Sequence, residues 1–213
     1  MNQFRIGVVV ASAFAFAGIA AAPAHASANL LSNSSFETPI VAGGFTTVGT
    51  GGDLGAWTVD SGSIDHIGSY WQAADGVQSV DMSGNEDGKI SQTVNTSAGQ
   101  TYELSWWESG NNDGGSAIKH LSALIDNNQV ALAAFDTTGT TKSNMRWTKF
   151  TYDFVSVGGP TTVSFQGTEG NPYGAALDNV SLKAVPEAST VVLFGLMLVG
   201  GSLLLRKRVS NSL

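Results

Sequence analysis

The stretch "TYELSWWE", Thr101–Glu108, decides the fold because its apolar and polar residues alternate. Tyr102, Leu104 and Trp106 fall on one face, and Trp107 falls on the other. Since successive side chains of a strand point to opposite faces, this period of two predicts a half-buried β-strand. The same alternation is found in "KHLSALI" (119–125), "KFTYDFV" (149–155) and "TTVSFQG" (161–167).

Clusters of Gly, Asn and Asp separate these runs, as in "SGNEDG" (83–88), "SGNNDGG" (109–115) and "EGNPYG" (169–174). Such clusters favour tight turns, and the sequence between them has no apolar stripe with the helical period of 3.6 residues. About ten short strands with this spacing are typical of sandwiches and barrels. The pattern predicts an all-β fold, an antiparallel β-sandwich of jelly-roll type, over residues 27–184.

The N-terminal residues 1–26 are expected to be a secretory signal peptide. A basic residue is followed by an apolar run and by the small-residue pattern "AHA", with cleavage expected after Ala26. This segment would form a helix and direct the protein out of the cytoplasm. The chain has no cysteine, which excludes a disulfide framework and thiolate chemistry in the exported protein.

The C-terminal residues 185–213 have the layout of a membrane segment. Pro186 and Glu187 precede an apolar run, expected to form a single transmembrane helix at about 189–205, and the basic end follows at Arg206, Lys207 and Arg208. The apolar run Val191–Leu205 would form a helix only about 22 Å long, short of a hydrocarbon core of about 30 Å. The basic side chains would therefore have to snorkel to the membrane surface. A removable sorting signal and a permanent single-pass anchor are both compatible with this segment.

The charge of the domain argues against nucleic acid as a partner. Of the 17 acidic residues only Glu187 lies outside residues 29–184, whereas four of the 10 basic residues do, which leaves a net charge of −10. Such a surface repels phosphate backbones and suits divalent cations or neutral polymers.

Two acidic residues near the ends of the domain are candidate metal ligands. Glu37 lies in "NLLSNSSFETP" (29–39) and Asp178 in "YGAALDNVSL" (173–182), both of which look like strands. Because the first and last strands of a jelly roll often pair, the two carboxylates would lie close and could bind Ca²⁺ together with backbone carbonyls. The alternative is a solvent-facing Glu37 and a turn-capping Asp178.

A stretch rich in aromatic and polar residues, "GSYWQAADG" (68–76), is the candidate ligand site. Exposed aromatic faces stack on sugar rings, and amides or carboxylates bind the hydroxyls. The candidate contacts are Tyr70, Trp71, Gln72 and Asp75, with Trp107 as a second aromatic contact. The alternative is that these aromatic residues belong to the core, as we expect for Trp57, Trp106 and Trp147.

No catalytic constellation is visible, and the protein is not expected to be an enzyme. Glycoside hydrolysis needs two positioned carboxylates, but most acidic residues here lie in turns. His66 and His120 lack zinc-site spacing. Sugar binding is therefore the favoured function, with a structural or adhesion protein without a sugar site as the alternative.

Four blocks resemble the bacterial choice-of-anchor family, which is related to a plant cell-wall family of unknown-function domains: "NLLSNSSFE" (29–37), "WTVDSGSIDHIGSYWQAADGVQSVDMSG" (57–84), "ISQTVNTSAGQTYELSW" (90–106) and "ALDNVSL" (176–182). The resemblance implies a galactose-binding-like sandwich, polysaccharide as a partner, and a structural Ca²⁺ held by residues matching Glu37 and Asp178.

The tail "VPEAST…RKR" is similar to the bacterial PEP-CTERM sorting signal, although Ala188 stands where the second proline is expected. This resemblance implies processing by signal peptidase at the N-terminus and by an exosortase near Pro186–Glu187. The protein would pass transiently through the inner membrane and end at the cell envelope surface or in the extracellular matrix.

Overall fold

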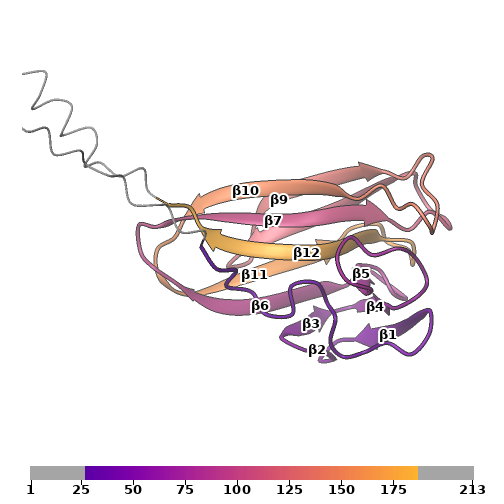
Figure 1. Cartoon of the computed structure of the whole chain (residues 1–213), viewed down its shortest axis with the longest axis horizontal. Coiled ribbons are helices and arrows are strands. Elements are labelled where there is room, and N and C mark those ends of the chain that lie inside the picture. The colour runs from indigo at the N-terminus through magenta and orange to yellow at the C-terminus, as the bar shows by residue number, and fades with distance from the viewer. Residues whose placement is uncertain (1–26, 187–213) are drawn as a thin grey trace, which may run out of the picture. The chain divides into compact units, whose positions relative to one another are not determined.

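A computed structural model describes residues 27–186, which form one compact unit with its own core (Figure 1). The unit is an all-β sandwich of two six-stranded sheets, so the predicted fold class is confirmed. Among residues 27–186 there is no helix long and apolar enough to cross a membrane. The predicted signal-peptide helix and transmembrane helix lie outside the described residues.

Every strand pairing in both sheets is antiparallel. The first sheet has the order β1 (Phe45–Gly49), β4 (Ser63–Ile67), β5 (Ser79–Asp81), β12 (Ala175–Ala184), β7 (Thr101–Gly110) and β10 (Thr148–Val155). The second has the order β2 (Asp53–Leu54), β3 (Trp57–Ser61), β6 (Lys89–Thr96), β11 (Gly159–Gly167), β8 (Ile118–Ile125) and β9 (Asn128–Asp136).

The four alternating stretches are the strands β7, β8, β10 and β11, as predicted. On β7, Trp106 is only 1% exposed, whereas Trp107 on the opposite face is half-buried. The core between the sheets is built around Phe165, whose ring centroid lies 5.5 Å from that of Trp106 and 6.3 Å from that of Trp57. Aromatic rings from both sheets therefore meet at the centre of the sandwich.

The segment 29–39 is not a strand, and that prediction was wrong. It does run beside β12, because the Leu30 N–H donates to the Leu182 carbonyl and the Asn29 side chain binds backbone groups of Val180 and Leu182. Farther along, Asn33 and Phe36 adopt φ values of 47° and 55°, which a strand cannot accommodate. The expected pairing of the two ends is thus made by an irregular segment.

The short strands β1, β4 and β5 gather toward one end of the sandwich (Figure 1). On β5 the Val80 side chain belongs to the main core, so Asp81 points to the outer face of the first sheet. A second, smaller cluster of apolar side chains covers part of this outer face: Ile67, Trp71, Met145 and Ala176.

Candidate functional site

A cleft of about 270 Å³ opens on the outer face of the first sheet over β1, β4 and β5. The remaining walls come from the loop 68–78, which carries Tyr70 and Trp71, from the loop 82–88, and from the loops that precede β8 and β12. The lining combines aromatic side chains with carboxylates and amides: Phe45, Tyr70, Trp71 and Tyr173 with Asp65, Asp81, Asp113, Asn85 and Asn111.

Two carboxylates lie side by side in the cleft because Asp65 on β4 and Asp81 on β5 are register partners. Burial raises the pKa of the Asp65 carboxyl, and a hydrogen bond of 2.6 Å from the Thr47 hydroxyl partly offsets this. Burial raises the pKa of Asp81 to about 7, although Asn111 Nδ2 donates to one of its oxygens at 2.9 Å. The cleft therefore holds two interacting acids on adjacent strands.

The Tyr70 side chain is held in place by a hydrogen bond, a cation–π contact and an aromatic contact. Its hydroxyl donates to Asp113 Oδ2 at 2.6 Å, which is the main cause of the lowered pKa of Asp113. The Lys142 ammonium lies 3.8 Å from the ring centroid and 3.1 Å from the same carboxylate. The edge of the ring packs against Phe45, with centroids 5.4 Å apart. Such a pre-positioned ring loses little freedom when a ligand stacks on it.

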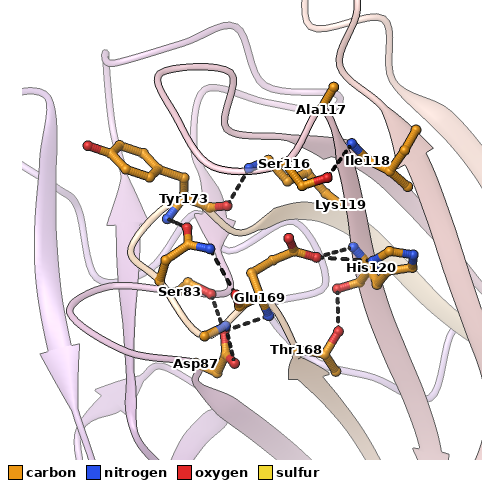
Figure 2. Close-up of polar contacts among 12 residues, drawn as sticks. Ser83, Asp87, Ser116, Ala117, Ile118, Lys119, His120, Thr168, Glu169 and Tyr173 are labelled. Carbon is orange, nitrogen blue, oxygen red and sulfur yellow. Dashed lines mark hydrogen bonds and ion pairs between the residues drawn. The ribbon is translucent and has the colours of Figure 1, made fainter.

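The second tyrosine of the cleft, Tyr173, packs against the backbone of the loop 111–117. A Cβ added at Gly114 would lie 2.6 Å from an atom of the Tyr173 ring, so the close approach requires glycine. The Tyr173 N–H donates to Asn171 Oδ1 at 3.0 Å, which fixes the backbone that carries the ring. Figure 2 shows the ring pointing away from the polar network behind it.

Lys119 ties the two cleft loops together from beneath. Its side chain lies inside the sandwich, and its Nζ donates to the carbonyls of Gly114 and Tyr173, each at 2.7 Å. Figure 2 shows the contact with Tyr173. Burial lowers the pKa of Lys119, while the charges of Glu169 and Asp81 oppose that effect. One buried ammonium thus holds the loop before β8 against the loop before β12.

A second set of contacts anchors the loop before β12. Asp87 accepts hydrogen bonds from the Glu169 and Gly170 N–H groups at 3.0 and 2.8 Å (Figure 2). Glu169 Oε1 in turn accepts the His120 N–H at 2.7 Å and lies 3.2 Å from His120 Nδ1. The acidic side chains of this region hold the backbone that presents Tyr173.

Of the predicted ligand contacts, the structure brings Tyr70 and Trp71 to the cleft. Trp71 is only 6% exposed, because its ring packs in the second apolar cluster and its Nε1 donates to Ser79 Oγ at 2.8 Å. The expected exposed indole face is therefore wrong. Gln72 lines a neighbouring hollow, and the exposed Asp75 and the half-buried Trp107 are not among the residues that line the cleft.

The predicted metal ligands both contact the loop 73–78. Asp178 Oδ2 accepts the Ala74 and Asp75 N–H groups at 2.7 and 2.9 Å, and Glu37 Oε1 accepts those of Val77 and Gln78, both at 2.9 Å. Ca²⁺ requires a shell of oxygen atoms, whereas these carboxylates receive N–H groups. Within residues 27–186 no three His, Cys, Asp or Glu side chains converge in a way that could hold a metal ion. The arrangement fits a loop clamp, and Ca²⁺ stays a prediction.

Sequence reasoning missed Asp65, Asp81, Asp113, Lys119 and Tyr173. Lys119 had a signal, because it is in phase with the core-facing Leu121 and Ala123 of the same strand. The sequence gives no signal for Asp65 and Asp81, because they become neighbours only through the pairing of β4 with β5.

Comparison with solved structures finds carbohydrate-binding modules. The xylan-binding CBM22-1 domain of Paenibacillus barcinonensis Xyn10C is 21% identical and has a TM-score of 0.47, over 78% of this chain and 99% of that one. A family 16 carbohydrate-binding module is 15% identical, with a TM-score of 0.48 over 72% of this chain and 99% of that one. At this distance a shared ligand does not follow.

Among curated proteins, halomucin of Haloquadratum walsbyi is 33% identical over an alignment of 187 residues, and the match covers 82% of this chain. The chain spans only 2% of the length of that relative.

The family comparison bears on the resemblance noted in the sequence. The relation to a family of unknown-function domains is confirmed, whereas the choice-of-anchor assignment and the PEP-CTERM signal stay predictions. Of the residues at the predicted processing sites, only Pro186 lies among the described residues. Ala26, Glu187 and the basic end at 206–208 lie outside them. Because the family model matches residues 29–183, the chain belongs to the family described as protein of unknown function (DUF642).

Proposed function

We propose that the sandwich is a non-catalytic carbohydrate-binding module of an exported protein. The observation that carries this proposal is the placement of two fixed tyrosine rings, Tyr70 and Tyr173, in one cleft with Asp65 and Asn85. Aromatic rings contact the apolar C–H faces of sugars, while carboxylates and amides bind the hydroxyls. The cleft offers both kinds of contact within a single small surface.

The size of the cleft favours a short segment of a glycan. Its volume of about 270 Å³ lies just below the range for ligand pockets, which begins at about 300 Å³. The cleft would therefore take one or two sugar rings of a longer polymer.

The environment of Asp81 supports binding over hydrolysis. Its oxygens accept hydrogen bonds from Asn111 Nδ2 and from the Ser83 and Gly174 N–H groups, at 2.9, 3.0 and 3.1 Å. Hydrolysis requires an acid that can hand its proton to the glycosidic oxygen. A buried Asp81 held by three N–H donors is better suited to holding the rim of the cleft.

A glycan array probed with residues 27–186 tests this proposal, and we expect the domain to retain at least one neutral oligosaccharide. Replacing Tyr173 with alanine should abolish the signal, because one of the two fixed tyrosine rings of the cleft is removed. Trp107→Ala, which removes an aromatic side chain outside the cleft, is the matched control and should bind as the wild type does. Binding to no glycan would favour the alternative, a structural or adhesion protein without a sugar site.

The proposal also includes the route of the protein. We propose export through the signal peptide, processing by signal peptidase after Ala26 and by an exosortase near Pro186–Glu187, and delivery to the envelope surface or matrix. The order of the Pro–Glu pair, the apolar run and the basic end supports this.

Mass spectrometry of the protein from its native host checks the processing step. We expect a mature chain that begins near residue 27 and lacks residues 191–213. An intact C-terminus would contradict exosortase processing and leave the permanent single-pass anchor as the explanation of the tail.

A further inference from the structure

The charges around the cleft are unevenly distributed. Three carboxylates line it, those of Asp65, Asp81 and Asp113. Among the described residues that line the cleft, none is Lys, Arg or His. Asp65 and Asp81 are the closest of these acids in the fold, because they are directly paired across β4 and β5.

The two basic residues near the cleft are already engaged with the protein. The Lys142 ammonium pairs with Asp113 at 3.1 Å and covers one face of Tyr70. The Lys119 ammonium is bound to the carbonyls of Gly114 and Tyr173, each at 2.7 Å. Neither partner set includes Asp65, whose carboxylate accepts its hydrogen bond from the neutral Thr47 hydroxyl. The negative charge of Asp65 is therefore left for the ligand to meet.

We infer that the cleft selects saccharides without negative charge and excludes uronates, with Asp65 as the residue that sets this preference. The inference rests on the proposed function, because it names the class of sugar that the same cleft would take.

The physical basis is the hydrogen-bonding role of the Asp65 carboxylate. A carboxylate can only accept hydrogen bonds, so it binds the hydroxyl groups of a neutral sugar and the ammonium group of an amino sugar. A uronate brings a second acceptor-only group and places like charges within a few ångströms of each other. At an effective dielectric constant between those of water and a protein surface, such a contact weakens binding by about tenfold or more.

The test is an array of matched pairs, in which neutral hexose oligosaccharides stand beside the same oligosaccharides oxidised to uronates at C6. The dissociation constants of the best-bound pair are then measured calorimetrically at low salt and about pH 8, where carboxylates are largely ionised. We expect the uronate to bind at least about tenfold more weakly than the neutral member. Its methyl ester, which is uncharged, should recover most of the affinity.

Two variants separate the charge of the cleft from the charge of the whole domain. Asp65→Asn keeps the size of the side chain and its acceptor oxygen. It should reduce the ratio of the uronate dissociation constant to the neutral one several-fold. Asp153→Asn removes an exposed carboxylate from β10, a strand that contributes no residue to the lining of the cleft, and should leave the ratio unchanged.

Each result decides between the proposals. Uronates that bind as well as their neutral partners, or a ratio that Asp65→Asn leaves unchanged, would overturn the preference while leaving sugar binding in place. An array on which nothing binds would overturn the proposed function, and the preference with it.

Discussion

Replacing Glu108 with glutamine is expected to make the stability of the domain markedly less sensitive to a rise in pH from about 5 to 8. Glu108 is fully buried, and within the described residues its Oε1 has no hydrogen-bond partner. Burial raises its pKa to about 8, against a weak opposing hydrogen bond of 3.3 Å from Trp106 Nε1. The folded domain therefore keeps a proton on Glu108 that the unfolded chain releases at about pH 4.5.

The sign of the effect follows from this difference. Between about pH 4.5 and pH 8 the unfolded chain binds fewer protons at Glu108 than the folded one, so the free energy of unfolding falls as the pH rises. The slope for one such group is about 1.4 kcal/mol per pH unit. Asp81 and Asp178, whose pKa values burial raises to about 7, act in the same direction.

Urea unfolding of wild type and Glu108→Gln at about pH 5 and pH 8 measures this contribution. We expect the variant to gain about 2–4 kcal/mol relative to wild type over this interval, because glutamine carries no charge at either pH. Glu103→Gln is the matched control, since Glu103 lies on the same strand with its carboxylate 3.8 Å from Lys149 and 42% exposed. If the free energy of unfolding changes with pH in the same way in wild type and Glu108→Gln, the raised pKa of Glu108 is contradicted.

Replacing Tyr70 with alanine is expected to weaken glycan binding by about 10- to 100-fold. A central aromatic contact typically contributes about 2 kcal/mol or more to binding, and the tyrosine ring is held in place before the ligand arrives. Tyr70→Phe separates the two roles of this residue. It keeps the ring but loses the hydrogen bond to Asp113, so its loss of affinity should be only a few-fold.

Calorimetric titration with the best-bound glycan compares these variants, and Trp107→Ala again serves as the control. Equal melting temperatures for the four proteins would show that the losses arise in the cleft. If Tyr70→Ala binds as tightly as wild type, the tyrosine ring is not a sugar contact and the ligand site lies elsewhere.

The strands were predictable because their signal is local. The alternation in β7, β8, β10 and β11 is visible in runs of seven or eight residues, and burial of one face enforces it. The segment 29–39 escaped this reasoning, since positive φ values at Asn33 and Phe36 break a pattern that looks like a strand.

The candidate site was predictable only in part. The stretch 68–76 does reach the cleft, but local sequence could not tell which of Tyr70 and Trp71 would be covered by Met145, a residue far along the chain. The pair formed by Asp65 and Asp81 depends on strand register, and the support from Lys119 depends on two loops that meet only in the folded chain.

The cleft lies near the Ala175 end of β12, and this position has a mechanical consequence. Ala184, at one end of this strand, is bound to Ser27, whereas Ala175, at the other end, pairs with Gly110 next to the cleft loops. A pull between a captured polymer and the points where the chain leaves the domain would act along the strands (Figure 1). Hydrogen bonds in antiparallel sheets lie perpendicular to that direction. The force would therefore shear all the hydrogen bonds between β12 and β7 at once, and they would not break one after another.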